Sequence, residues 1–257
     1  MKHETWSRLS ALLRQFFLDA LFPEFCLRCG VEGVVFCQHC VAAVPLQVLH
    51  GCPFCDRVSM MGKTCDACQS KTPLEGVFSF GLYSQPVFRE LVWALKYHGK
   101  RDLGLILGTR VASMVGSVIL SLSKDLVTTA VPLHPARRKS RGYNQSELIA
   151  RSVAETLGVP YANLLERVRA TPPQVEIHGV NDRLANVRNA FSVQRDVILS
   201  QAEGSRSAVA GRTSSLAGTS VLLVDDVVTT GATLTACARV LRRAGAARVY
   251  ALTLARG

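Results

Sequence analysis

The chain has 257 residues, of which 48% are hydrophobic and 19% are charged. This balance is typical of a globular protein with a sizeable core, and it excludes a chain that is disordered throughout. Lysine and arginine number 30, and aspartate and glutamate number 19, so the formal net charge is +11. A basic surface favours anionic partners such as phosphorylated metabolites or nucleic acid.

The opening segment, residues 1–24, is predicted to form an amphipathic helix. Its apolar residues recur at three- and four-residue steps from Glu4 to Leu21. We expect this helix to pack on the protein itself, because Arg8 and Arg14 give its polar face little positive charge; binding to a membrane surface is the alternative. Charged residues break the segment, so it is neither a membrane span nor a signal peptide, and the expected location is the cytoplasm.

Residues 25–72 are predicted to form a small zinc-binding module, because they hold eight of the nine cysteines in four Cys-x-x-Cys pairs. The pairs are Cys26/Cys29, Cys37/Cys40, Cys52/Cys55 and Cys65/Cys68. Both sulfurs of such a pair can face one point about 2.3 Å away, and two pairs complete a tetrahedral zinc site. The longest gap, eleven residues (41–51), separates the second and third pairs, so we expect two successive sites. A single ion and interleaved pairing are the alternatives.

Other uses of these cysteines fit the sequence less well. A disulfide framework would require an export signal, and a redox dithiol would not require four copies. An iron–sulfur cluster is a third alternative, since four cysteines also hold iron. His39 lies within the second pair and is expected to be a bystander rather than a ligand. Closed four-cysteine sites leave no position for water or substrate, so the module is predicted to be structural or to bind a partner.

Residues 73–257 are predicted to form an α/β domain with a mainly parallel sheet flanked by helices, because short apolar runs alternate with helical stretches. The expected strands are 77–83, 126–133, 221–224 and 249–254, and the expected helices are 88–97, 103–122, 146–157 and 231–244. Such sheets bind ligands at the carboxyl ends of their strands. Segment 201–218, rich in Ser, Ala, Gly and Arg, is expected to be an inserted mobile loop.

A phosphate site is predicted after the apolar run Val221–Val224. The run leads into Asp225 and Asp226, and a Thr/Gly turn, Thr229–Thr233, then opens a helix. Amides at the helix start and the threonine hydroxyls can surround a phosphate dianion. The two acids would repel that phosphate, so they are expected to meet a ribose diol or a metal ion. The structural alternative makes Asp226 a helix cap and Asp225 part of a surface pair.

The segment Val221–Leu234 resembles the phosphoribosyl-pyrophosphate (PRPP) motif of type I phosphoribosyltransferases. Together with the cysteine-rich start, it makes the chain similar to the ComF family, which includes ComFC and GntX-type proteins. Segment Val131–Ser146 matches the middle signature of that family, and Leu95–Tyr97 matches an earlier block. A later stretch is matched at Gln174, Arg183, Asn186 and Ala190-Phe191. The resemblance covers about residues 25–257, and only the long segment 201–218 departs from it.

This resemblance implies a type I phosphoribosyltransferase-like fold, a Rossmann-like parallel sheet, with a small double zinc-ribbon module. Asp225 and Asp226 would hold the ribose hydroxyls, and Mg²⁺ would bridge pyrophosphate and ribose oxygens. The 5′-phosphate would lie against Thr229, Thr230, Gly231, Ala232 and Thr233. The expected PRPP-binding cations are Lys96, Arg137, Arg138 and Lys139. The expected catalytic residues are Asp225, Asp226, Arg138 and Arg141.

Two functions stay open at this point. The first is a Mg²⁺-dependent phosphoribosyltransferase; the second is a non-catalytic module in natural transformation, whose zinc-held loops dock a helicase or single-stranded DNA. The basic run Arg137–Arg141 fits pyrophosphate, a nucleic-acid backbone with Tyr143 stacked on a base, or a solvated loop. Cys237 is expected to be a core thiol. The residues expected to meet the acceptor are Tyr143, Asn144, Gln145, Arg183 and Asn186.

Overall fold

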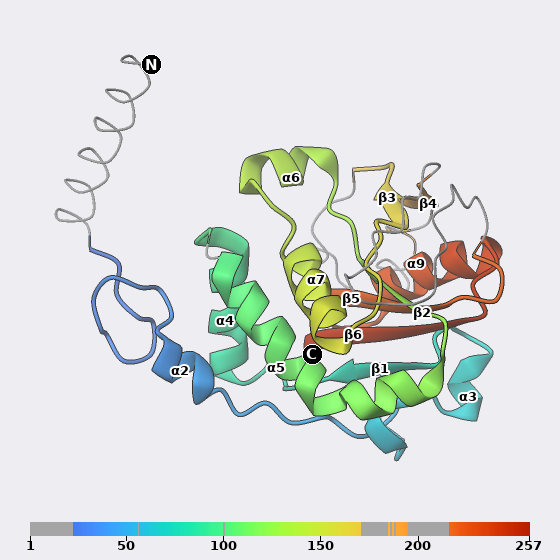
Figure 1. The fold of residues 1–257 in the computed structure, drawn as a ribbon, viewed down its shortest axis with the longest axis horizontal. Coiled ribbons are helices and arrows are strands. Elements are labelled where there is room, and N and C mark those ends of the chain that lie inside the picture. Colours follow the sequence, from blue (N-terminus) through green and yellow to red (C-terminus); the bar gives the residue numbers. More distant parts are fainter. Residues whose placement is uncertain are drawn as a thin grey trace. The chain divides into compact units, whose positions relative to one another are not determined.

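The structure, a computed structural model, describes residues 23–55, 57–99, 101–170, 185, 187, 189–194 and 216–257. These residues belong to two compact units, which divide between Val44 and Pro45 (Figure 1). The predicted module over 25–72 is therefore shared between the units, with four cysteines in the smaller unit and four in the larger one. The predicted N-terminal helix and most of the predicted loop 201–218 lie outside the described residues.

In the smaller unit, described from residue 23 to residue 44, a tight turn precedes one short helix, α2 (Gln38–Ala42). The amide of Cys26 donates to the carbonyl of Val31 over 2.8 Å. Cys37 caps α2, because its sulfur accepts a hydrogen bond from the amide of Cys40 over 3.4 Å. Both cysteine pairs of this unit therefore lie in hydrogen-bonded turns, as their two-residue spacing predicts.

Four parallel strands form the central sheet of the larger unit. Their order is β1 (Gly76–Ser79), β6 (Arg248–Arg256), β5 (Ser220–Val228) and β2 (Leu126–Ala130). All three pairings are parallel, which confirms the predicted sheet type. A separate antiparallel pair consists of β3 (Leu165–Arg167) and β4 (Phe191–Val193), and the sequence pattern did not predict it.

Helices cover both faces of this sheet (Figure 1). On one face α7 (Gln145–Leu157) contacts β2 and β5, and α5 (Arg101–Leu122) packs along α7. On the other face α9 (Ala232–Arg243) contacts β5 and β6 and shares a buried cluster with Val221 and Leu223. The residues between these two on β5 alternate to the face of α7. The predicted arrangement of a parallel sheet flanked by helices is confirmed.

The remaining helical segments of the larger unit are η1 (Met60–Gly62), α3 (Asp66–Gln69), α4 (Pro86–Tyr97) and α6 (Pro135–Arg141). α6 takes the place of the basic loop that was one expectation for this segment. Pro135 occupies its first turn, and the His134 ring accepts a hydrogen bond from the amide of Ala136 over 3.3 Å. The helix has no buried residue, so it has no apolar periodicity that could predict it.

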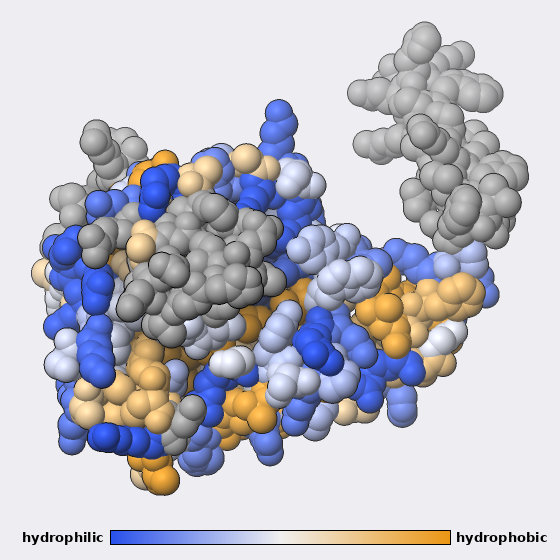
Figure 2. Space-filling view, turned by 180° about the vertical axis from the view of Figure 1, so that it is seen from behind, coloured by the Kyte–Doolittle hydropathy of each residue, from blue (hydrophilic) through white to orange (hydrophobic). Residues whose placement is uncertain are grey.

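Among the described helices, α5 is the one that is long and apolar enough to cross a membrane by length and composition. It is also a core helix, in which Leu107 and Val111 are fully buried. An added Cβ at Gly108 would lie 2.7 Å from Ser152 Cβ, so this glycine permits the close packing of α5 on α7. Figure 2 shows separate hydrophobic patches between hydrophilic residues on the face that it draws. Packing on α7 accounts for the buried apolar residues of α5, whereas Leu105, Ile106, Met114 and Leu120 are exposed.

Candidate functional site

Asp225 and Asp226 lie near the carboxyl end of β5, within the strand rather than after it, because β5 continues to Val228. The Ser146 hydroxyl donates to Asp225 Oδ1 over 2.9 Å, and Gln145 Nε2 donates to Asp226 Oδ2 over 3.0 Å. The Lys96 ammonium lies 2.9 Å from the same Oδ2. One oxygen of each carboxylate, Asp225 Oδ2 and Asp226 Oδ1, takes part in none of these contacts. Each acid therefore has one fixed oxygen and one that can receive a donor.

The surroundings of these acids change their protonation. Burial and then the charge of Asp226 raise the pKa of Asp225 to about 7, although Ser146, the Asp226 amide and Lys96 act in the opposite direction. Burial would lower the pKa of Lys96, but the charges of Asp226 and Asp225 raise it above its ordinary value. Lys96 is therefore charged at neutral pH. Asp225 changes charge close to neutral pH, which is typical of a functional site.

A cavity of about 300 Å³ opens beside the two acids. Its lining comes from the ends of β2 and β5 and from α4, α6, α7, α9 and β3. The polar and aromatic lining residues are Tyr83, Lys96, Tyr97, Arg137, Arg141, Gln145, Ser146, Arg167, Asp225, Asp226, Thr229 and Thr233. Four of them are cations, and they face two acids and two threonine hydroxyls. The pocket combines these charged and hydroxyl groups with apolar lining residues, and it lies at the carboxyl end of a parallel sheet, the expected location of a ligand.

The turn between β5 and α9 offers hydrogen-bond donors that an anion could accept. Gly231 precedes α9 with a φ of 72°, a left-handed conformation that favours glycine. It provides no side chain that could cap the first amides of α9. The Thr230 hydroxyl is buried and has no hydrogen-bond partner in the same part of the chain. A ligand with acceptor oxygens would satisfy these donors.

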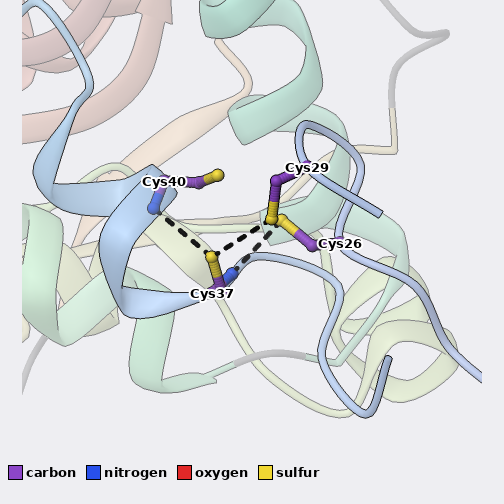
Figure 3. A group of neighbouring side chains, drawn as sticks. All are labelled: Cys26, Cys29, Cys37 and Cys40. Carbon is purple, nitrogen blue, oxygen red and sulfur yellow. Dashed lines mark hydrogen bonds between the residues drawn. The ribbon is translucent and has the colours of Figure 1, made fainter. Parts of the chain in front are cut away.

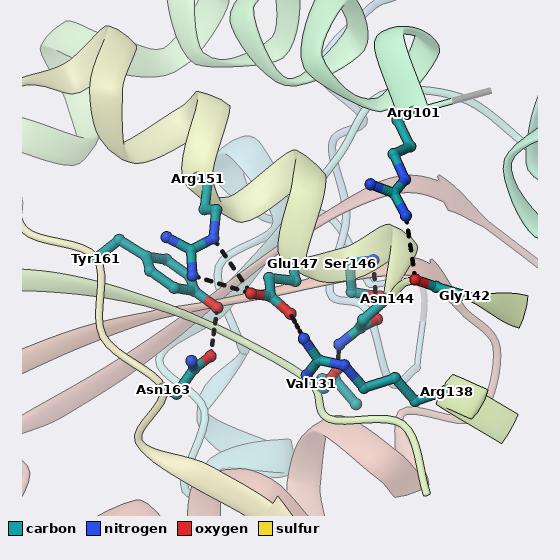
Figure 4. Close-up of polar contacts among 10 residues, drawn as sticks. All are labelled: Arg101, Val131, Arg138, Gly142, Asn144, Ser146, Glu147, Arg151, Tyr161 and Asn163. Atoms are coloured by element: carbon teal, nitrogen blue, oxygen red, sulfur yellow. Dashed lines mark hydrogen bonds and ion pairs between the residues drawn. The ribbon is translucent and has the colours of Figure 1, made fainter. Parts of the chain in front are cut away.

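The four cations of the predicted basic run divide into two groups. Arg137 and Arg141 line the pocket. Arg138 instead forms an ion pair with Glu147, with 3.0 Å between Nη2 and Oε2 (Figure 4). Lys139 is exposed and does not line the pocket. The prediction that Arg138 and Lys139 contact PRPP therefore has no support from their positions.

Two expected acceptor residues act within the fold. Tyr143 is buried, with its hydroxyl donating to the carbonyl of Leu95, so its ring is not available for stacking on a base. Asn144 donates to the carbonyl of Val131 over 3.0 Å and caps α7 by accepting from the Ser146 amide over 3.2 Å (Figure 4). Both residues fix the chain between α6 and α7. Gln145 lines the pocket, whereas the expected residues Arg183 and Asn186 lie outside the described residues.

The comparison with known proteins points to the same family as the sequence motifs. Residues 144–257 match the phosphoribosyl transferase domain. The DNA utilization protein YhgH of Salmonella typhimurium is 31% identical over 247 residues, which cover 91% of this chain and 97% of that protein. The chain belongs to the ComF family. Competence protein F of Haemophilus influenzae is 28% identical over 236 residues, 91% of this chain and 85% of that protein.

Solved structures resemble this ComF-family chain only slightly. A hypoxanthine phosphoribosyltransferase from Staphylococcus aureus is 13% identical at a TM-score of 0.32, covering 59% of this chain and 64% of that chain. A likeness of this size adds nothing to the assignment, which depends on the matched domain and the relatives.

Sequence reasoning did not single out three of the polar lining residues of this ComF-family protein. Ser146, at the start of α7, holds Asp225. Tyr83 follows β1, and Arg167 ends the short strand β3. Burial, then the nearby Arg137 charge, lowers the pKa of Arg167. Only Ser146 had a sequence signal, because it closes the middle signature; the pairing of β3 with β4 is what brings Arg167 to the pocket.

The first cysteine group lies in the smaller unit (Figure 3). The sulfurs of Cys26, Cys29, Cys37 and Cys40 lie within 4.8 Å of one another, and those of Cys29 and Cys37 are 3.6 Å apart. A tetrahedral zinc site with bonds of about 2.3 Å requires sulfurs about 3.8 Å apart, so the geometry fits. Burial would raise the pKa of Cys26, but amide hydrogen bonds from Cys37, Cys29 and Arg28 lower it to about 6, which favours the thiolate at this position. Burial and the neighbouring thiols raise the pKa of Cys40 to about 12.

The second group, Cys52, Cys55, Cys65 and Cys68, lies in the larger unit with the same geometry. The Cys55 and Cys65 sulfurs are 3.5 Å apart. Burial would raise the pKa of Cys52, but amide hydrogen bonds from Cys65 and Phe54 lower it to about 7. All described cysteines are free thiols, and His39 belongs to neither group. The groups are successive, as predicted from the spacers, and each can hold a structural zinc ion.

Proposed function

We propose that this protein binds PRPP together with Mg²⁺ at the pocket beside Asp225 and Asp226, and that it transfers or recognises the phosphoribosyl group. The observation that carries the proposal is the pairing of these carboxylates with the Thr/Gly turn. Each acid keeps one oxygen outside the contacts of the pocket, and the turn offers the hydroxyl of Thr230 without a partner among the described residues.

The two ends of the ribose would meet different groups. The vicinal hydroxyls would donate to Asp225 Oδ2 and Asp226 Oδ1, because carboxylates only accept hydrogen bonds. The 5′-phosphate would bind the first amides of α9 and the threonine hydroxyls of the turn, where the helix dipole favours negative charge. Thr229 and Thr233 line the pocket on this side.

The pyrophosphate would lie against the pocket cations Arg137, Arg141 and Arg167, with Lys96 at its edge. The planar guanidinium group suits bidentate contacts with phosphate oxygens. Carboxylate oxygens are ligands that Mg²⁺ accepts, but Lys96 already neutralises Asp226, so the pyrophosphate and ribose oxygens are the better candidates to hold the ion. When bound there, Mg²⁺ would spread the charge of the leaving group.

The proposed reaction is displacement of pyrophosphate at ribose C1 by an acceptor nucleophile. Its transition state carries positive charge on the ribose ring and negative charge on the leaving group. The acids would lie beside the ribose and the arginines beside the pyrophosphate. Each group of protein charges would then be opposite in sign to the charge that develops next to it, and would stabilise that charge. Positioning provides the rest of the catalysis, and no side chain needs to become covalently bound.

Calorimetry with PRPP and Mg²⁺ tests the proposal. We expect the double substitution Asp225→Asn and Asp226→Asn to weaken PRPP binding by at least about 100-fold, because two hydrogen bonds to charged acceptors are lost. The matched control is Asp102→Asn with Asp125→Asn, which removes the same charge from two exposed acids. Unchanged affinity in the first double variant, with its fold intact, would contradict the proposal.

A second candidate is binding of single-stranded DNA or a helicase in natural transformation, in the cytoplasm. The printed names of the relatives, competence protein F and DNA utilization protein, suggest it. Exposed Lys139 and half-exposed Arg138 on α6 are free of the pocket and could meet a phosphate backbone. We expect salt-dependent retention of single-stranded DNA that Lys139→Ala weakens while PRPP affinity is unchanged. A protein that retains no DNA above a few tens of millimolar salt would exclude direct contact.

A further inference from the structure

The turn that precedes α9 contacts the second cysteine group. A Cβ added to Gly231 would lie 2.5 Å from Phe54 Cε1 and 3.2 Å from Phe54 Cδ1. Carbon atoms do not approach this closely, so the Phe54 ring occupies the space beside the Gly231 backbone. Phe54 itself lies between Cys52 and Cys55 and packs against the core cluster that includes the buried face of α9.

The segment that directly follows the second cysteine group contacts α9 at two more points. Thr72, four residues after Cys68, shares a buried hydrogen bond of 3.0 Å between its hydroxyl and that of Thr235. The guanidinium of Arg239 donates to the carbonyl of Lys71 over 3.0 Å. The amides of Lys71 and Thr72 both donate to the carbonyl of Cys68, which connects these contacts to the metal ligands. Phe54, between the first two cysteines of the group, therefore lies against the turn before α9, and the residues just after Cys68 contact α9 itself.

The position of Phe54 depends on its neighbours in the group. Its amide donates to the sulfur of Cys52, as in the turns that enclose a metal-bound thiolate. A metal ion that holds Cys52 and Cys55 would fix the backbone on both sides of the ring. Gly231 has no side chain to restrict its backbone, and the local restraint on it is the hydrogen bond of 2.8 Å that its carbonyl accepts from the amide of Thr235.

We propose that Phe54 is a positioning residue for the phosphate turn, and that the second cysteine group, when it holds zinc, sets the affinity of the site for a 5′-phosphate through it. The inference rests on the proposed function. With the ring in place, Gly231 keeps its left-handed conformation, and the first amides of α9 keep a single orientation toward the phosphate. Without the ring, the turn gains freedom and must lose it again when the phosphate binds, which costs affinity.

The proposal predicts an effect on one end of the ligand only. Ribose 5-phosphate probes the turn, whereas inorganic pyrophosphate probes the arginine side of the pocket. We expect Phe54→Ala to weaken ribose 5-phosphate and PRPP by about tenfold, the loss of about one ordered contact, and to leave pyrophosphate affinity unchanged. Zinc content, measured by metal analysis, is expected to be the same as in the wild type, because Phe54 contributes no ligand.

Two variants serve as controls. Phe25→Ala makes the same change beside the first cysteine group, at a ring that is 50% exposed, and is expected to leave all three affinities unchanged. Phe54→Leu keeps an apolar side chain beside Gly231 and is expected to recover most of the lost affinity. It also provides the test if Phe54→Ala does not fold.

The outcomes separate this inference from the proposed function. If the wild-type protein binds neither PRPP nor ribose 5-phosphate, the proposed function is wrong and the inference with it. If the wild type binds them and Phe54→Ala binds them equally well, only the inference is wrong. A variant that loses zinc, or loses pyrophosphate affinity by the same factor, would show a general structural role and would also overturn the inference.

Discussion

Replacing one buried cysteine in each group is expected to have unequal effects. Cys40→Ser and Cys68→Ser remove matched ligands, which are 6% and 4% exposed. Each variant is expected to hold about one zinc ion where the wild type holds two. Cys68→Ser should lower the main unfolding midpoint by more than about 10 °C, because a structural zinc site contributes roughly 10 kcal/mol, comparable with the whole stability of a domain. Cys40→Ser should leave that midpoint nearly unchanged.

The reason for the difference is the location of the two groups. The first group belongs to the smaller compact unit, and the second belongs to the unit that contains the sheet. The second group also connects to α9 through the hydroxyls of Thr72 and Thr235 and through Leu74, which is buried in the core cluster. Scanning calorimetry with parallel metal analysis measures both effects. An equal decrease of the main unfolding midpoint in the two variants would contradict the different roles proposed for the two groups.

The sequence signal for the central part of the candidate site is local. The apolar run of β5, the two acids and the Thr/Gly turn follow one another within 14 residues, Val221–Leu234. One segment therefore contains both the functional groups and the spacing that positions them. The cysteine pairs are local in the same way. Within each pair the two-residue spacing already forms the turn, and the spacers between pairs indicated the grouping.

Residues that reach the site through tertiary contacts were harder to predict. Arg167 lines the pocket from a strand of three residues that pairs with Phe191–Val193, and the sequence pattern did not predict this pair. The four charges within Arg137–Arg141 looked equivalent in the sequence. In the short helix α6, however, Arg137 and Arg141 line the pocket and Arg138 pairs with Glu147. Tyr143 looked like a stacking residue, yet its hydroxyl satisfies the end of α4. A single sequence does not specify which face of such an element is buried.

Asp225→Asn is expected to stabilise the protein at pH 8 and to have little effect near pH 4. Burial and then Asp226 raise the pKa of Asp225 to about 7, above its value of about 4 in an unfolded chain. The folded state therefore binds this proton more tightly than the unfolded state. The stabilisation that the bound proton gives to the folded state is fully present below about pH 4 and is lost as the pH rises through 7.

At pH 8 the charged Asp225 thus makes the folded state less stable than a neutral side chain of the same shape would. A shift of this size corresponds to about 2–4 kcal/mol, or about 5–10 °C in Tm for a domain of this length. Thermal unfolding between pH 4 and pH 8 measures the effect, with the exposed Asp125→Asn as the control. Equal Tm values for Asp225→Asn and the wild type at pH 8 would contradict it. Retaining such an acid lowers stability, which is expected where a carboxylate serves ligand binding rather than folding.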